Sequence, residues 1–166
     1  MSSNVVEHLR RVEAFSGLSD EELIHVATIC KGRRFAAGQT VFQEGEDGDE
    51  MMVILDGCVR VSITTRLPDG TMAPSTINML YKGQSFGEMV LLGGATRSAT
   101  VSCVDPCTLI VIKERDFAAL CERSPRIGYR VMRNMASDLA YKLRSSNLLL
   151  RGNIRWQQGE LGKRST

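Results

Sequence analysis

The middle of the chain, from Arg33 to Lys113, is divided into short apolar runs by glycines that recur about every ten residues. These runs are rich in valine, isoleucine and threonine, which favour strands over helices. The glycines between them are Gly38, Gly45, Gly48, Gly57, Gly70, Gly83 and Gly87. Many short strands with turns at such a spacing are typical of an antiparallel barrel or sandwich. The sequence therefore predicts a central antiparallel β-structure.

Two features inside this region support antiparallel strands joined by tight turns. Val59, Val61 and Ile63 alternate with polar residues, so one face of that strand is expected to point inward and the other toward water. The sequence Pro68-Asp69-Gly70 predicts a turn, followed by a strand through residues 76–80.

Helical sequence lies on both sides of the β region. Ser19 and Glu22 have the spacing of a capping box, and apolar residues at helical spacing follow, which predicts a short helix ending near Gly32. After a short helical segment over residues 116–121, Ser124-Pro125 predicts the start of a long helix that reaches at least Ser145. This helix is expected to act as a lid on the barrel, as half of a dimer seam, or as both. Its apolar stripe consists of Ile127, Val131, Met135, Leu139 and Leu143.

Length and composition bound the class of protein. With 166 residues, 43% of them hydrophobic, the chain is predicted to form one domain over residues 1–146 and an extension over 147–166 that is loosely ordered beyond Gly152. The chain has neither a start like a signal peptide nor a run of about 18 apolar residues, which predicts a cytoplasmic protein without a membrane segment. Five cysteines, an odd number, favour buried reduced thiols over a disulfide framework.

Charge is distributed unevenly along the chain. Residues 1–121 carry 11 Lys and Arg against 16 Asp and Glu, whereas residues 122–166 carry 10 against 3. A basic tail attracts nucleic acid or an acidic partner, but a solvated helix face is the more common explanation. Trp156, close to Arg151 and Arg155, likewise fits either stacking on bases or packing at a helix end.

The residues from Phe86 to Thr100 carry the pattern with the most chemical content. Gly87 permits a ligand to approach the backbone closely, and the apolar run that follows fits one helical turn whose N–H groups face an anion. Arg97 offers a guanidinium suited to a pair of phosphate oxygens, and Ser98 adds a further donor. Glu88 supplies an acceptor for a sugar hydroxyl. The pattern predicts a site for an anionic ligand that carries a sugar.

This stretch resembles the phosphate-binding cassette of the cyclic nucleotide-binding domain family, which includes catabolite activators, kinase regulatory subunits and ion channels. Residues 41–49 and 51–61 are similar to the glycine-bearing hairpin of that family and its following strands. The resemblance covers roughly residues 10–146. It implies an α+β fold, in which an antiparallel jelly-roll β-barrel is flanked by a short N-terminal helix and a long C-terminal helix.

The resemblance also implies roles for individual residues. Glu88 would accept a hydrogen bond from the ribose 2′-hydroxyl, and Arg97 would pair with the cyclic phosphate. Because Ser98 follows the arginine, the resemblance favours cyclic AMP over cyclic GMP as ligand. Neither a metal nor a further cofactor is expected. The remaining predicted ligand-binding residues are Phe86, Gly87, Met89 and Ser98 in the cassette, Val61 and Leu80 beside the base, and Lys142 on the long helix.

The sequence departs from the family pattern in the cassette and in the long helix. Val90 stands where kinase-type cassettes often have alanine, and Gly93-Gly94 makes the loop more flexible. The long helix has Tyr141-Lys142-Leu143 where catabolite activators place hydroxyl residues against adenine. These departures leave base specificity open.

The predicted function is a cyclic nucleotide receptor and not an enzyme, in which the ligand biases the C-terminal helices between two packings. The hinge is expected at residues 117–124. We expect a homodimer through the long helix, an unidentified protein as effector, and no DNA-binding domain, since only about 20 residues follow Ser146. The alternatives are the sensor half of a transcription factor or channel, and a ligand-free interaction scaffold of the same fold.

Two other interpretations of single motifs stay open at this point. Glu88 and Arg97 fit an ion pair within a protein that has lost its ligand. Cys103 and Cys107 are separated by three residues and suggest a metal site, although no nearby histidine or cysteine completes a set of ligands. No Ser or Cys lies along the sequence at a spacing from His8 or His25 that is typical of catalysis.

Overall fold

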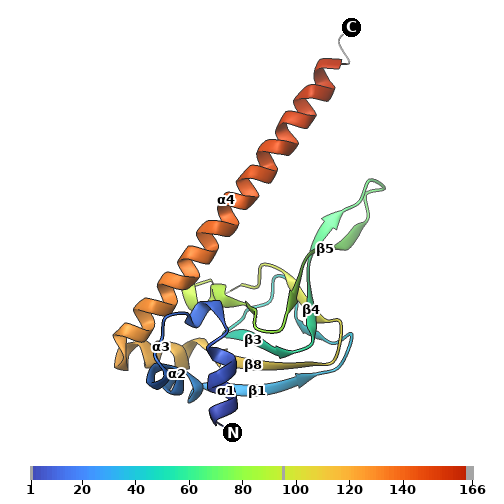
Figure 1. Ribbon diagram of the computed structural model, residues 1–166. Helices are drawn as coiled ribbons and strands as arrows, with labels where there is room; N and C mark the ends of the chain where they lie inside the picture. Colours follow the sequence, from blue (N-terminus) through green and yellow to red (C-terminus); the bar gives the residue numbers. More distant parts are fainter. Residues whose placement is uncertain (1, 95, 164–166) are drawn as a thin grey trace.

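The computed structural model describes the backbone of residues 2–94 and 96–163, and the side chains of residues 5–94 and 96–144. Two antiparallel four-stranded sheets form its centre, one in the order β1-β8-β3-β6 and the other in the order β2-β7-β4-β5 (Figure 1). Their strands are β1 (Cys30–Phe35), β2 (Thr40–Phe42), β3 (Glu50–Asp56), β4 (Cys58–Arg66), β5 (Met72–Tyr81), β6 (Ser85–Phe86), β7 (Thr100–Cys103) and β8 (Cys107–Lys113). The predicted jelly-roll fold is confirmed. The barrel is corrected to a sandwich, because each sheet ends at an edge strand and the two do not close on each other.

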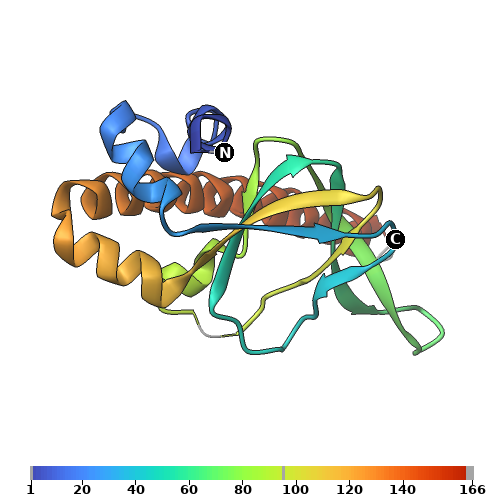
Figure 2. The same ribbon diagram turned by 90° about the horizontal axis from the view of Figure 1, so that it is seen from below.

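The shorter helices and the start of α4 gather at one end of the sandwich, and α4 then runs past the strands (Figure 2). They are α1 (Ser2–Leu9), the 3₁₀ helix η1 (Glu13–Phe15), α2 (Asp20–Ala27), α3 (Glu114–Arg123) and α4 (Pro125–Lys163). The predicted capping box is present: the Ser19 side chain accepts from the Glu22 N–H, and the Glu22 carboxylate accepts from the Ser19 N–H. However, α2 ends at Ala27 and not near Gly32, because residues from Cys30 onward pair with β8.

The apolar residues form two buried clusters. One lies between the two sheets and includes Ile54, Val59 and Leu109. The other lies between the helices and the outer face of β3 and β8, where Val53 and Ile112 pack. Since β3 and β8 take part in both clusters, their sequences are apolar almost without interruption, as is typical of strands covered on both faces.

The expected alternation along β4 changes halfway along the strand. Val59 is buried and Val61 half-buried, as predicted, but Ser62 is buried as well and Ile63 is only half-buried. The register between β4 and β5 shifts between Val61 and Ser62, so that Ile77 on β5 has no partner. Such a bulge bends the strand and re-aims its side chains. The predicted turn at Gly70 (φ +86°) does join β4 to β5.

Helix α4 is both part of the core and the longest projection of the molecule. Ile127, Val131 and Met135 are buried, whereas Leu143 is 63% exposed, so the apolar stripe packs on its own domain only over the first half. Asn134 Nδ2 donates to the carbonyls of Ala14 (3.1 Å) and Ser16 (2.8 Å), which fixes α4 to η1. Arg126 pairs with the Glu22 carboxylate at the start of α2.

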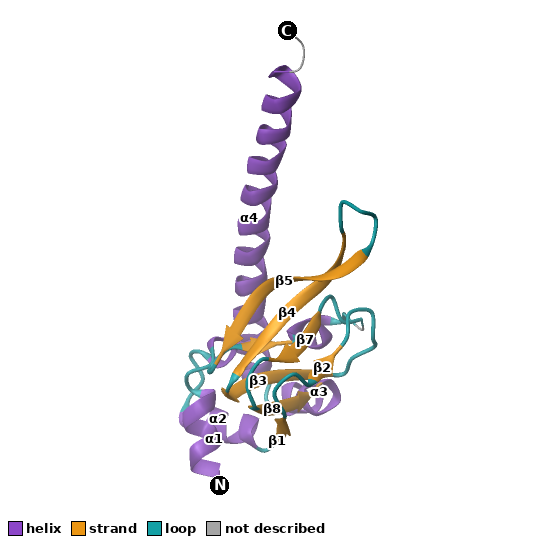
Figure 3. Cartoon of the chain, turned by 90° about the vertical axis from the view of Figure 1, so that its right-hand side faces the viewer, coloured by secondary structure: helices purple, strands orange, loops and turns teal. Residues whose placement is uncertain are grey.

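Beyond this anchored part, α4 leaves the body on the same side as the β4–β5 hairpin (Figures 1 and 3). The helix continues to Lys163, whereas the sequence predicted a loosely ordered tail after Gly152. Isolated glycines interrupt the helical sequence there without ending the helix. The division into a domain over 1–146 and an extension over 147–166 stays a prediction. The side chains of Arg151, Arg155 and Trp156 lie outside the described residues.

The cysteines behave as small apolar residues. All five carry free thiols, and Cys58, Cys103 and Cys107 are buried. Burial raises the pKa of Cys103 to about 12, which keeps this thiol protonated. Among the described residues, no group of three or more His, Cys, Asp and Glu side chains is placed to hold a metal ion. No helix in the part of the chain that was searched is long and apolar enough to cross a membrane.

Candidate functional site

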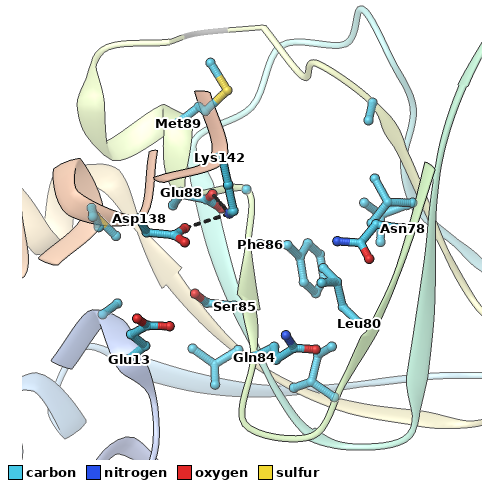
Figure 4. Close-up of a pocket in the computed structure, with 18 of the residues that line it drawn as sticks. Glu13, Asn78, Leu80, Gln84, Ser85, Phe86, Glu88, Met89, Asp138 and Lys142 are labelled. Carbon is cyan, nitrogen blue, oxygen red and sulfur yellow. Dashed lines mark hydrogen bonds and ion pairs between the residues drawn. The ribbon is translucent and has the colours of Figure 1, made fainter. Parts of the chain in front are cut away.

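A cavity of about 850 Å³ lies where the β4–β5 sheet, the cassette and α4 meet (Figure 4). Its lining comes from segments far apart in the sequence: β4 and β5 supply apolar side chains, residues 83–89 and 96–99 supply the cassette, and α4 supplies residues 134–142. All residues predicted to bind ligand line this one cavity, including Val61, Leu80, Phe86, Met89, Ser98 and Lys142. The fold therefore brings the residues of the predicted site together around one cavity.

The cassette backbone is shaped by two glycines around a short helix. Gly87 has φ +73°, Gly93 has φ +90°, and the 3₁₀ helix η2 (Glu88–Leu92) lies between them. Only glycine adopts such angles without strain. Val90 and Leu91 are buried in the helical cluster, so the apolar run anchors the cassette to the core. Met89 is 43% exposed at the rim of the cavity.

Arg97 is one of the few buried polar residues, with 7% of its surface exposed. Its Nη1 donates to the backbone carbonyl of Glu50 (2.8 Å), and its Cζ lies 4.0 Å from the centre of the Phe42 ring. Its Nε is buried and has no hydrogen-bond partner. Burial lowers the pKa of Arg97, while the carboxylates of Glu50, Asp49 and Glu46 act in the opposite direction. One donor of this buried cation is thus left without a protein acceptor.

No carboxylate within the described side chains forms an ion pair with Arg97, since the nearby acids are engaged elsewhere. The Glu50 carboxylate lies 2.9 Å from Arg33 Nη1 and 3.6 Å from Lys113 Nζ. Asp49 also pairs with Lys113, at 3.5 Å. The protein therefore neutralises Glu50 and Asp49 with other cations.

Two glycines make room for the guanidinium. A Cβ atom at Gly48 would overlap Arg97 Nε and Cζ and would lie 2.8 Å from Nη2. A Cβ atom at Gly87 would lie 2.7 Å from Arg97 Nη1 and 3.1 Å from the Glu50 carbonyl. Real Cβ atoms essentially never lie within 3.0 Å of such an atom, a limit that the contacts with Arg97 would break at both positions. Glycine at positions 48 and 87 is therefore required for Arg97 to lie where it does.

Glu88 pairs with α4 and not with Arg97. Its side chain is 14% exposed, and its Oε1 lies 3.3 Å from Lys142 Nζ (Figure 4). Lys142 Nζ is also 2.7 Å from Asp138 Oδ2, one helical turn earlier. Glu88 and Arg97 therefore do not form the ion pair with each other that the alternative interpretation, a protein that has lost its ligand, predicted.

Several residues at the site escaped the sequence analysis. Phe42 packs under the guanidinium, Gly48 gives it room, and Asp138 holds Lys142. Asn78 points toward the cavity from β5, close to Leu80 (Figure 4). For Asp138, the spacing of four residues to Lys142 on one helix was a usable signal. The contacts of the others depend on strand pairing that no local pattern reveals.

Comparison with known proteins identifies the class to which this fold and cavity belong. The model of the cyclic nucleotide-binding domain matches residues 32–124. The chain therefore belongs to the cyclic nucleotide-binding domain family, whose domains are regulatory.

Particular relatives carry this domain within longer proteins. The chain is 35% identical over 131 residues to glutaminase 1 of Bradyrhizobium diazoefficiens, a match that covers 79% of this chain and 20% of that protein. It is 31% identical over 136 residues to the cyclic AMP receptor protein of Thermus thermophilus, covering 82% and 59%. The solved structure of the Thermus thermophilus catabolite activator protein superimposes with a TM-score of 0.72 at 31% identity, covering 83% and 61%. The chain thus spans between one fifth and three fifths of these curated relatives.

Proposed function

We propose that this chain is a receptor for a cyclic nucleotide, with Arg97 binding the cyclic phosphate and Glu88 accepting a hydrogen bond from the ribose 2′-hydroxyl. Backbone groups of Gly87, Met89 and Ser98 complete the phosphate site. The apolar side chains of Val61 and Leu80 lie beside the base.

The observation that carries this proposal is the environment of Arg97. A buried cation is costly unless an anion or a full set of acceptors compensates it. Here, among the side chains that the structure describes, one donor of Arg97 lacks a partner and no carboxylate pairs with the guanidinium, which lines a cavity. The cavity volume of about 850 Å³ lies within the range of small-molecule sites. A phosphate at Arg97 supplies both the missing acceptor and the missing charge.

We propose cyclic AMP as the preferred ligand. Ser98 follows the arginine, where family members that select cyclic GMP often have threonine. The relative from Thermus thermophilus is named as a cyclic AMP receptor protein, which supports the same choice.

The proposed signal is a movement of α3 and α4 relative to the sandwich. The predicted hinge at residues 117–124 consists of most of α3 together with Ser124, which lies between α3 and α4, and Lys142 connects α4 to the cassette. A ligand moves such an element only if it binds two arrangements with different affinities.

The chain is proposed to act without catalysis and to pass its signal to another protein in the cytoplasm. A role as the sensor part of a longer transcription factor or channel is the alternative, and a reading frame extending beyond Thr166 would establish it.

We expect the wild-type chain to bind cyclic AMP in isothermal titration calorimetry, and to bind cyclic GMP about tenfold more weakly, a difference of about 1.4 kcal/mol. Cyclic di-GMP is the third ligand to compare. Heat from none of the three at high micromolar protein would contradict the proposed receptor and favour the ligand-free scaffold.

We also propose a homodimer through α4. Tyr129 and Leu143 are large exposed apolar residues that lie within about 40° of each other around this helix, and an apolar face of this kind favours a partner that covers it. Light scattering is expected to give twice the chain mass of 18.3 kDa, and L143E to lower that mass. A monomer mass with and without nucleotide would refute this arrangement.

A further inference from the structure

Helix α4 brings two charged side chains, Asp138 and Lys142, to the part of the cavity where Glu88 lies. Lys142 Nζ lies between Asp138 Oδ2 at 2.7 Å and Glu88 Oε1 at 3.3 Å (Figure 4). The three side chains come from two elements, since Glu88 opens η2 and the other two lie on α4. Two carboxylates therefore converge on one ammonium beside the cavity.

This ammonium compensates charges that the ligand leaves unbalanced. Glu88 is largely shielded from water, and its only cationic partner among the described side chains is Lys142. A cyclic nucleotide brings a sugar hydroxyl to Glu88 but no positive charge, and its phosphate adds a negative charge nearby. Without Lys142, the Glu88 and Asp138 carboxylates would face each other and an anionic ligand, which is unfavourable at short range.

The charge state of Lys142 is consistent with such a role. Burial disfavours its charged form, but the hydrogen bond to Asp138 and the charge of Glu88 outweigh burial and raise the pKa of Lys142. Lys142 therefore stays protonated at neutral pH.

The geometry leaves room for Lys142 and a ligand on the same carboxylate. Lys142 contacts Oε1 of Glu88, and no donor among the described side chains contacts Oε2. A carboxylate has lone pairs for several donors. A sugar hydroxyl can thus be accepted at Oε2 while Lys142 keeps its place at Oε1.

We infer that Lys142 is a positioning residue, which holds and neutralises Glu88 so that this carboxylate can accept the sugar hydroxyl, without itself contacting the ligand. This inference rests on the proposed function, and it changes the predicted role of Lys142 from direct ligand binding to an action through Glu88. By linkage, a ligand that fixes Glu88 also fixes the part of α4 that carries Lys142.

The test is a cycle of one substitution and one change of ligand, followed by calorimetry. The ligand is whichever of cyclic AMP and cyclic GMP binds the wild type more tightly, together with its 2′-deoxy form. We expect K142M to weaken binding of the ribose form about tenfold, and K142R to restore most of it because the charge is retained. R133M removes a charge from α4 outside the cavity lining and is expected to leave affinity unchanged.

The 2′-deoxy ligand separates positioning from direct contact. If Lys142 acts through Glu88, the wild type loses about tenfold on removal of the hydroxyl, whereas K142M loses much less, because both changes disable one contact. The inference would be overturned, and the proposed function kept, if the wild type binds but the losses from K142M and from removal of the hydroxyl simply add. An affinity of K142M equal to that of the wild type would have the same meaning. A wild type that binds neither nucleotide would overturn the proposed function and this inference with it. Thermal unfolding of each variant, expected near the wild-type temperature, shows that the comparisons concern folded protein.

Discussion

R97A is expected to weaken cyclic nucleotide binding by about 30-fold to several thousand-fold, which corresponds to about 2–5 kcal/mol for losing one member of a buried charged contact. The substitution removes the only buried cation described at the cavity, and with it the donor that lacks a protein acceptor. Calorimetry with cyclic AMP measures the loss. Near-native affinity in this variant would refute the phosphate role.

The stability of the same variant gives an independent check. Because Arg97 is desolvated and incompletely paired without ligand, its removal is expected to leave the unfolding temperature of the free protein unchanged or higher. The ligand, which raises the unfolding temperature of the wild type, should raise that of R97A little or not at all. R97K retains the charge but not the planar fork and is expected to bind with intermediate affinity. A large drop in unfolding temperature for R97A would instead indicate a structural role.

G48A is expected to weaken binding about 30-fold or more while leaving stability within about 1 kcal/mol of the wild type. The added Cβ would occupy the space of Arg97 Nε and Cζ, so the guanidinium must leave its position under the cavity. Since the displaced atoms belong to the end of a flexible side chain, the fold itself yields easily. Calorimetry and thermal unfolding measure the two effects separately.

Gly32 provides the matched control for this substitution. Neither Gly48 nor Gly32 has a positive φ, and a Cβ at Gly32 would meet no atom within 4 Å. G32A is therefore expected to bind as the wild type does. Equal affinities of G48A and G32A would show that the position of Arg97 does not matter for binding.

The amino-acid sequence predicted the parts of the site that lie close together along the chain. The stretch from Phe86 to Thr100 contains Gly87, Glu88 and Arg97 within twelve residues, and its pattern of glycine, acid and arginine is a local property. The capping box at Ser19 and the start of α4 at Pro125 were predicted for the same reason, since helix starts are set by neighbouring residues.

What escaped prediction depends on contacts between distant segments. Phe42 and Gly48 reach Arg97 across about 50 residues, and Lys142 reaches Glu88 across a similar separation. The alternation of apolar and polar residues along β4 predicted the inward face correctly as far as Val61. It did not predict the bulge at Ile77, because a bulge depends on the register between two strands. The open edges of the two sheets likewise follow from strand pairing.

The length of α4 sets how far a change at the cavity travels. From Lys142 to Lys163 the helix rises about 30 Å beyond its contact with the cassette, at 1.5 Å per residue. A bend of about 10° at that contact, with the packed first half of α4 held in place, would move the far end by roughly 5 Å, about one helical pitch. In the proposed mechanism α4 would therefore act as a lever, in which a small displacement beside Glu88 would produce a displacement of about one helical pitch at the far end of the helix, where an effector protein would bind.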